Sequence, residues 1–302
     1  MFGERSGQAF QKEFDMPRAE RGTSRKDAHR GHQPEVGLMG TKGSLVITAL
    51  GDIPLLRQVR NSRFVSHHQL FKLLEHDAVV SSRRSFNWRI QRLLKAHHIE
   101  GLDAVHWDGS RVYSVTQNGL IALESQGEFA VALNSRTRHM PDRIQVFHAL
   151  ELNAIRLSLA RTALLVSWQS DVEVSSANMV SGTPYQKDYD AIVKMWVGNE
   201  VREFALEYER TLKTRTRYEK IRAALEAESN VGCVLYLTVD PNLMLAILCQ
   251  LRHSAKRVGF LTARSLKEHL LAAFVATDTN RPMVSLEEFL QKHAWTCNRK
   301  ET

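Results

Sequence analysis

Residues 81–116 read SSRRSFNWRIQRLLKAHHIEGLDAVHWDGSRVYSVT, a basic stretch followed by two short alternating runs. Its first half, 81–98, holds five Lys or Arg residues and no Asp or Glu. An apolar face at helical spacing is formed by Phe86, Ile90, Leu93, Leu94 and His97. An Asp-Gly pair between alternating runs is typical of a β-hairpin turn. The stretch therefore predicts a basic amphipathic helix followed by a hairpin.

Two more helices are predicted upstream of this stretch. One begins at about Asp52, in DIPLLRQVRNSR, and the second lies in VSHHQLFKLLEH, where Ser66 is placed to cap it. Ser81 or Ser82 is placed to cap the third helix, and Gly101 to end it. Three helices followed by a hairpin form the element order of a winged helix-turn-helix.

In a helix-turn-helix the third helix of such a set enters the major groove of DNA. Arg, Asn and Gln side chains there reach base edges, while residues of a hairpin wing contact phosphate. The candidate DNA-contacting residues are Arg83, Arg84, Asn87, Trp88, Gln91, Arg92, Lys95 and, beside the hairpin turn, Arg111. A solvated basic face is the alternative interpretation. The net charge of +8 and the pI near 9.5 favour a polyanionic partner.

The pattern changes from Asp142 onward. A long helix over about 143–161 precedes three predicted strands, 163–174, 188–197 and 202–209. A charged helix over 212–228, a strand over 231–239, a helix from Pro241 to about 253 and a strand over 257–262 follow. The order α-β-β-β-α-β-α-β predicts a sheet covered by helices. The domains expected are a loosely attached tail (1–44), a winged helix (45–125), a linker (126–141) and an α/β domain (142–302).

Several carboxylates fall on the central predicted strands. Glu207 and Glu209 share a strand face by alternation, and Asp190 lies beside Glu207 if the second and third strands form a hairpin. Converging carboxylates suit Mg²⁺, which a nuclease uses to activate water. Ion pairs of these carboxylates with Arg210, Arg215 or Arg217 are the alternative interpretation.

This order of elements resembles the PD-(D/E)XK nuclease fold. Asp190 stands at the first acidic position, with Tyr189 in place of the expected proline, and Glu207 stands at the second. Glu209 occupies the place of the lysine, a departure that only a lysine from the next helix, Lys213 or Lys220, would compensate. The extra acids Glu151 and Glu173 are further candidates. Asp190 and Glu207 are the metal ligands if the chain is an Mg²⁺-dependent nuclease; otherwise no cofactor is expected.

Four stretches give the chain a broader family resemblance. They are DIPLLRQVRNSRFVSHHQLFKLL (52–74), RVYSVTQNGLIAL (111–123), HALELNAIRLSLAR (148–161) and FALEYERTLKTRTRYEK (204–220). Through them the chain, over roughly 45–270, resembles the replication-relaxation family of plasmids and integrative elements. The resemblance implies a double-stranded-DNA-binding protein that serves in replication or transcription control of such an element.

Other expectations concern assembly and location. A single winged helix offers a small interface, so a homodimer held by the α/β domain is expected, with replication or partner proteins as further contacts. Cys233, Cys249 and Cys297 form no zinc or disulfide pattern, which predicts reduced thiols and a cytoplasmic location. No apolar run is long enough for a membrane span. The two classes of function left open are a DNA-binding protein and a metal-dependent endonuclease.

Overall fold

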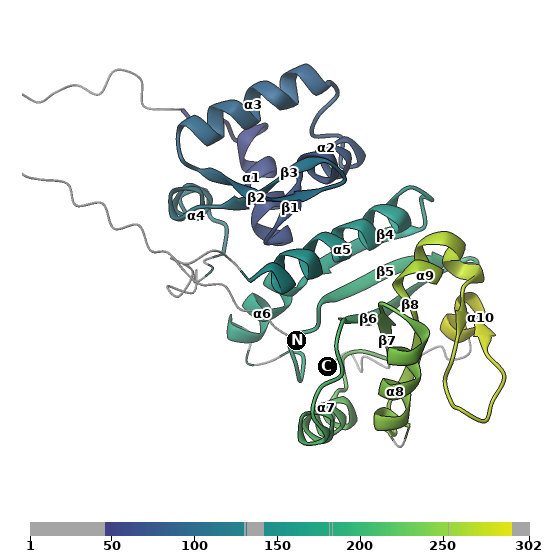
Figure 1. Cartoon of the computed structure of the whole chain (residues 1–302). Coiled ribbons are helices and arrows are strands. Elements are labelled where there is room, and N and C mark those ends of the chain that lie inside the picture. Colours follow the sequence, from purple (N-terminus) through teal and green to yellow (C-terminus); the bar gives the residue numbers. More distant parts are fainter. Residues whose placement is uncertain are drawn as a thin grey trace, which may run out of the picture. The chain divides into compact units, whose positions relative to one another are not determined.

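The computed structural model describes residues 46–129, 131, 142–180, 182, 184–252 and 254–291. All of these residues belong to one compact unit, Leu45–Thr302. The fold is mixed α+β, in agreement with the class that the sequence predicts (Figure 1). The predicted tail, 1–44, lies outside the described residues, as does most of the predicted linker, 126–141.

The N-terminal half of the described chain alternates short helices with a small sheet. Its elements are α1 (Asp52–Ser62), β1 (Val65–Ser66), α2 (His67–His76), α3 (Arg83–Lys95), β2 (Ile99–Trp107), β3 (Ser110–Val115) and α4 (Gln117–Glu124). The three strands pair antiparallel in the order β1-β3-β2. The order of three helices and a hairpin is the one that the sequence predicts, whereas β1 and α4 are additional.

Local signals fix the ends of these elements. Ser66 and Gln69 form a reciprocal capping box, in which Ser66 Oγ accepts from the Gln69 amide at 3.1 Å. Ser82 caps α3 by accepting from the Ser85 amide at 3.2 Å. Asp108 and Gly109 both have positive φ, 49° and 69°, as a two-residue type I′ hairpin turn requires. The prediction that Gly101 ends α3 is wrong. The helix ends at Lys95, and Gly101 lies within β2.

One buried carboxylate holds α3 against α1. Asp52 Oδ2 accepts from the backbone amide and the hydroxyl of Thr48, both at 2.8 Å, and also binds the guanidinium of Arg92. Asp52 is fully buried. Burial alone raises the pKa of this carboxyl, but the hydrogen bonds from Arg92 and Thr48 outweigh it, and the net pKa is lowered. The carboxylate is therefore ionised and tied to α3.

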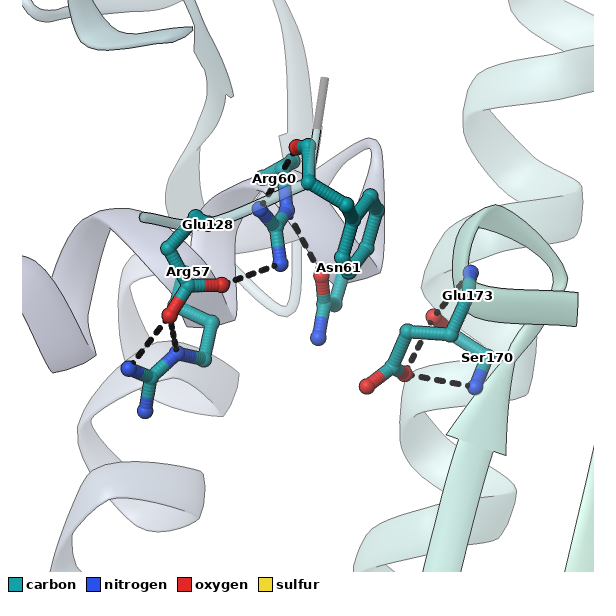
Figure 2. Close-up of polar contacts among 7 residues, drawn as sticks. Arg57, Arg60, Asn61, Glu128, Ser170 and Glu173 are labelled. Carbon is teal, nitrogen blue, oxygen red and sulfur yellow. Dashed lines mark hydrogen bonds and ion pairs between the residues drawn. The ribbon is translucent and has the colours of Figure 1, made fainter. Parts of the chain in front are cut away.

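The segment after α4 is fastened to α1 by a second set of charges (Figure 2). Arg57 Nε donates to Glu128 Oε1 at 2.7 Å, and Arg60 donates to Glu128 Oε2 at 3.0 Å. The side chain of Arg60 is buried, and its guanidinium also lies 3.8 Å from the ring centroid of Phe129. This arrangement positions the chain where it leaves the N-terminal helices.

The C-terminal half is built on a five-stranded sheet. Its elements are α5 (Arg143–Ala160), β4 (Leu165–Ser170), α6 (Asp171–Val180), β5 (Ala191–Val197), β6 (Glu200–Glu209), α7 (Arg215–Ala227), β7 (Cys233–Thr238), α8 (Pro241–Leu251), β8 (Arg257–Thr262), α9 (Ala263–His269), η2 (Leu270–Ala272), β9 (Phe274–Val275), β10 (Val284–Ser285) and α10 (Leu286–Gln291). The sheet order is β4-β5-β6-β7-β8. Strands β4 to β6 pair antiparallel, and β6 to β8 pair parallel.

Helices cover both faces of this sheet (Figure 1), and each face has its own apolar core. One face packs against α5, through Leu152, Ile155 and Leu159, and against α9 and α10. The other face packs against α7 and α8, with Tyr218 and Leu248 among the buried side chains. Strands buried on both faces explain the continuous apolar run of β7.

Helix α5 also packs against the N-terminal half. Val146 and Leu150 share a small apolar cluster with Val105 and Val112 of the hairpin. The amide of Asn153 donates to the carbonyl of Phe64 at 2.9 Å, and the Gln69 amide donates to the carbonyl of Leu150 at 2.8 Å. Helix α5 thus packs both against the sheet and against the hairpin of the N-terminal half.

The predicted first strand, 163–174, is wrong in its second half, because helix α6 begins at Asp171. The Ser170 amide donates to Glu173 Oε2 at 2.8 Å, and the Glu173 amide donates to Ser170 Oγ at 3.4 Å (Figure 2). This is the capping box that the sequence Ser-Asp-Val-Glu encodes. Glu173 therefore caps a helix and is not an acid on a strand.

Asp52→Asn is expected to destabilise the chain by about 2–3 kcal/mol, because it leaves the partly exposed Arg92 without its anionic partner. The stability given by the lowered pKa of Asp52 is present above the ordinary pKa of 3.8 and is lost as pH falls through the folded-state value. Urea unfolding at pH 7 measures the first effect. Lys72→Ala, which breaks the exposed pair with Glu75, is the control and should cost less than about 1 kcal/mol.

Candidate functional site

Helix α3 presents a polar face to solvent. Phe86, Ile90 and Leu93 are fully buried in the N-terminal core. On the other side six of the predicted DNA-contacting side chains are exposed: Arg83, Arg84, Asn87, Trp88, Gln91 and Lys95. Trp88 is 60% exposed, which is unusual for a tryptophan. The division into a core face and a cationic face is the one that the sequence predicts, except that His97 is exposed beyond the helix end.

Arg92 does not belong to that exposed set. Its guanidinium binds Asp52 and lies 4.7 Å from the ring centroid of Trp88. The side chain is 21% exposed. The assignment of Arg92 as a freely exposed contact is therefore corrected, since its first role is to hold α3 to α1 and to support Trp88. Arg83 lies 4.4 Å from the ring centroid of Phe71 and remains exposed.

Asn87 is positioned by a short chain of hydrogen bonds. Nε2 of His67 lies 3.1 Å from Asn87 Oδ1, and Nδ1 lies 3.1 Å from the hydroxyl of Tyr113. An amide oxygen only accepts, so Nε2 carries the proton and Nδ1 accepts from Tyr113. Burial, and the charges of Arg83 and His68, lower the pKa of His67. The neutral imidazole orients the Asn87 amide and leaves its nitrogen able to donate outward.

Arg111 occupies the hairpin beside the turn. It pairs with Asp103 across the two strands, and both side chains are exposed. Its guanidinium lies over Gly101, where an added Cβ would come within 2.2 Å of Arg111 Nε. Gly101 thus provides the space that this side chain needs. Because an exposed ion pair contributes little, a phosphate can compete with Asp103 for Arg111.

The carboxylates of the sheet converge as the sequence predicts. Ala191 pairs with Leu206, which places Asp190 next to Glu207 across β5 and β6. Asp190 is predicted to lie on β5, but it immediately precedes that strand. Its Oδ2 accepts from the Tyr208 amide at 2.7 Å and lies 3.3 Å from His148 Nε2. Asp188 does not join this group but accepts from Asn178 at 2.7 Å.

The partners of these carboxylates differ from the predicted arginines. Glu207 pairs with Lys187, whose Nζ lies 2.7 Å from Oε1, and Glu209 pairs with Lys213. Arg210 instead donates to the carbonyl of Ile144. The side chain of Lys220, the other predicted lysine, is exposed on α7 and makes no ion pair with the described residues. The pairing of the carboxylates with Arg210, Arg215 or Arg217 is therefore wrong.

The environment of Glu207 is unusual for a carboxylate. Burial, together with the nearby charges of Asp190 and Glu209, raises its pKa to about 7, although Lys187 acts in the opposite direction. For His148, burial lowers the pKa, but the bond to Asp190 and the carboxylate charge outweigh it and the pKa is raised. Lys187 and His148 therefore each engage one oxygen of the carboxylate pair, Glu207 Oε1 and Asp190 Oδ2.

Two of these partners are missing from the sequence prediction. Lys187 stands three residues before Asp190, in the run Lys-Asp-Tyr-Asp, and that proximity was the available signal. His148 comes from α5, 42 positions before Asp190 in the chain, so only the fold brings them together. His148 and Asp190 line a cavity of about 650 Å³, whose wall includes Asn153, Trp168 and Asp171.

Within the described part of the chain no group of three or more His, Cys, Asp or Glu residues is arranged to hold a metal ion. No helix among the described residues is long and apolar enough to cross a membrane. No protein-family model, curated protein or solved structure matches the chain. The geometry of the helix and of the carboxylates is thus the basis for any functional assignment.

Glu207→Gln is expected to change the pH dependence of folding. The unfolded chain ionises Glu207 near pH 4.5, and the folded chain near pH 7, so its stabilising contribution is complete below pH 4.5 and is lost as pH rises through 7. The variant should therefore gain stability relative to wild type over that interval, by at most about 1.4 kcal/mol per pH unit. Urea unfolding at pH 4.5, 6 and 7.5 measures the difference.

Lys187→Met is the matched variant for this measurement. Removal of the ammonium should raise the pKa of Glu207 further and extend the upper end of the sloping interval to higher pH, because Lys187 lowers that pKa in the native chain. A difference between wild type and Glu207→Gln that is constant over the whole pH range would contradict the raised pKa of Glu207.

Proposed function

We propose that the chain binds double-stranded DNA through α3. The observation that carries the proposal is the solvent-exposed face of this helix, on which Arg84, Asn87, Trp88, Gln91 and Lys95 lie with no acidic side chain. Arg, Lys, Asn and Gln are the side chains that read guanine and adenine edges in the major groove. A helix anchored on its inner face and cationic on its outer face suits insertion into that groove.

We also propose a specific fold for each half of the chain. We assign α1, β1, α2, α3, β2 and β3 to a winged helix, with the β2–β3 hairpin as the wing and Arg111 as a phosphate contact. The C-terminal sheet is assigned to a PD-(D/E)XK-like domain reused for dimerisation or partner binding. The four stretches that resemble the replication-relaxation family support a cytoplasmic role in replication or transcription control on a plasmid or mobile element.

A triple variant tests the recognition helix. Duplexes selected by the wild type from a random-sequence pool provide the probe, and binding is measured by fluorescence anisotropy. Arg84→Ala, Gln91→Ala and Lys95→Ala together should abolish the preference for the selected duplex, because each lost base contact costs about 1–3 kcal/mol. Arg111→Ala alone should weaken binding to all duplexes alike and reduce the salt slope by about one unit.

The control removes two exposed cations elsewhere, Arg161→Ala with Arg264→Ala, for the same change in net charge. It should keep the sequence preference. Equal affinity of the triple variant and the wild type for the selected duplex would rule out α3 as the recognition helix.

A second candidate function is metal-dependent DNA cleavage by Asp190 and Glu207. The adjacency of these two carboxylates, with the ammonium of Lys187 close by, is the observation in its favour. Against it, Lys187 and His148 already engage both carboxylates, and Glu209 with Lys213 forms a separate pair. We therefore propose a structural role for this cluster.

Supercoiled plasmid incubated with Mn²⁺ or Mg²⁺ distinguishes the two functions. No nicking is expected from the wild type, from Asp190→Ala or from Glu207→Ala. Nicking by the wild type that both variants lose would assign an endonuclease, and nicking that the variants retain would indicate a contaminant.

A further inference from the structure

Helix α7 carries a second concentration of positive charge. Residues 213–222 contain five Lys or Arg residues and one acid, Glu219. Arg217 and Lys220 are exposed, and Arg222 is half-buried at the edge of the helix. Among the described residues none of these three side chains has a hydrogen-bond or ion-pair partner.

The orientation of α7 is fixed by its apolar side. Tyr218, Ile221 and Leu225 are buried in the core between the helix and the sheet. Arg217 and Lys220 are three residues apart and therefore lie on the same side of the helix. The buried side chains prevent the helix from rotating, so these cations cannot turn inward to find partners.

A groove lies on the other flank of the helix, between α7 and the end of α8. It has a volume of about 280 Å³, and its cationic wall comprises Arg215, Arg222 and Arg252. Gln250 adds an amide to the same wall. Arg215 pairs with Glu219 at 3.2 Å, but its side chain is 86% exposed, and such a pair contributes little to stability.

Apart from the exposed pair of Arg215 with Glu219, the cations at the start of α7 do not stabilise the helix. Its first turn contains no acidic residue, and Arg215 and Arg217 stand where the helix dipole disfavours cations. Cations in the first turn of a helix are unfavourable, and no contact among the described residues offsets that cost at Arg217. Such a departure points to a role in binding. A polyanionic partner would supply the compensating charge.

We infer that α7, with the adjacent groove, is a second surface for the phosphodiester backbone of duplex DNA. The inference rests on the proposed DNA-binding function and extends it. Unlike α3, α7 itself exposes no Asn, Gln or aromatic side chain beside its cations, and Gln250 in the groove wall can donate to a phosphate oxygen as well. Arginine and lysine without such neighbours contact phosphates and carry no sequence information. α7 therefore contributes affinity that is independent of sequence, whereas α3 contributes the preference.

The test uses the full chain and a triple variant, Arg217→Gln, Lys220→Gln and Arg222→Gln. Affinity for the selected duplex and for a scrambled duplex is measured between 50 and roughly 300 mM salt, a range over which phosphate contacts are resolved. The salt slope should fall by about 2–3 units for both duplexes, since each phosphate contact contributes about 0.9. The ratio of the two affinities should stay at the wild-type value.

The matched control, Arg161→Gln, Arg264→Gln and Arg281→Gln, removes the same charge from exposed positions outside α7. It should reduce the slope by less than one unit. An equal reduction in the control would show a general effect of net charge and overturn the inference. An unchanged slope in the α7 variant would also overturn it, and would direct the surface to an acidic protein instead.

The α3 and α7 variants keep the two proposals apart. The α3 variant should retain weak, salt-dependent binding to any duplex, and the combined six-residue variant should lose that binding. If the α3 variant keeps the full sequence preference while the α7 variant loses affinity, the recognition helix is wrong and the α7 surface stands. If the residual binding persists unchanged in the combined variant, the α7 surface is wrong. Circular dichroism confirms that each variant is folded.

Discussion

The buried carboxylate of Asp52 is the constraint on which the presentation of α3 depends. Asp52, the first residue of α1, accepts two hydrogen bonds from Thr48, which precedes the helix, and binds the guanidinium of Arg92 on α3. A charge without solvent is costly unless it is paired and hydrogen-bonded. The pair therefore fixes α3 relative to α1. The ionised carboxylate of Asp52 therefore also positions the outer face of α3, including Trp88 beside Arg92.

Helix α3 is also held from α2 and from the hairpin. Tyr113 on β3 contacts the imidazole of His67 on α2, and His67 contacts Asn87 on the outer face of α3. An Asn side chain at the surface is ordinarily free to rotate, and ordering it costs conformational entropy. The imidazole reduces that cost before any partner arrives. The solvent-exposed side chain of Asn87 is thus preorganised by His67 on α2 and Tyr113 on β3.

The carboxylates of the sheet, in contrast to the exposed polar side chains of α3, are buried and paired. Glu207 and Glu209 are each 5% exposed, and lysines from separate segments neutralise them. Asp190 is engaged by His148 and by the Tyr208 amide. Through these contacts the cluster links β6 to α5 and to the segment before β5. Helix α7, which follows β6, differs, because Arg217, Lys220 and Arg222 have no ion-pair partner among the described residues.

Periodicity and capping residues in the sequence determined most of the elements. Phe86, Ile90 and Leu93 marked the buried side of α3, Ser66 and Ser82 marked helix starts, and Asp108-Gly109 marked the hairpin turn. These signals work because they involve neighbours within a few residues. Ser170 and Glu173 carried a signal of the same kind for the start of α6, and it was readable in the sequence although the prediction missed it. The adjacency of Asp190 and Glu207 followed from the same local logic, since one short hairpin sets the register.

The tertiary structure alone decided the partners of the charged side chains. Arg92 has the same spacing as Gln91 and Lys95 on the outer side of α3, yet a carboxylate forty residues earlier draws it inward. Glu209 and Lys213 are close in sequence, but His148 reaches Asp190 only because α5 packs across the sheet. Charge pairing depends on distance in space and on burial, and neither is encoded within a local window of sequence. The sequence by itself therefore determined which segments are helices and strands, while packing determined which of their charges are neutralised and which remain for a partner.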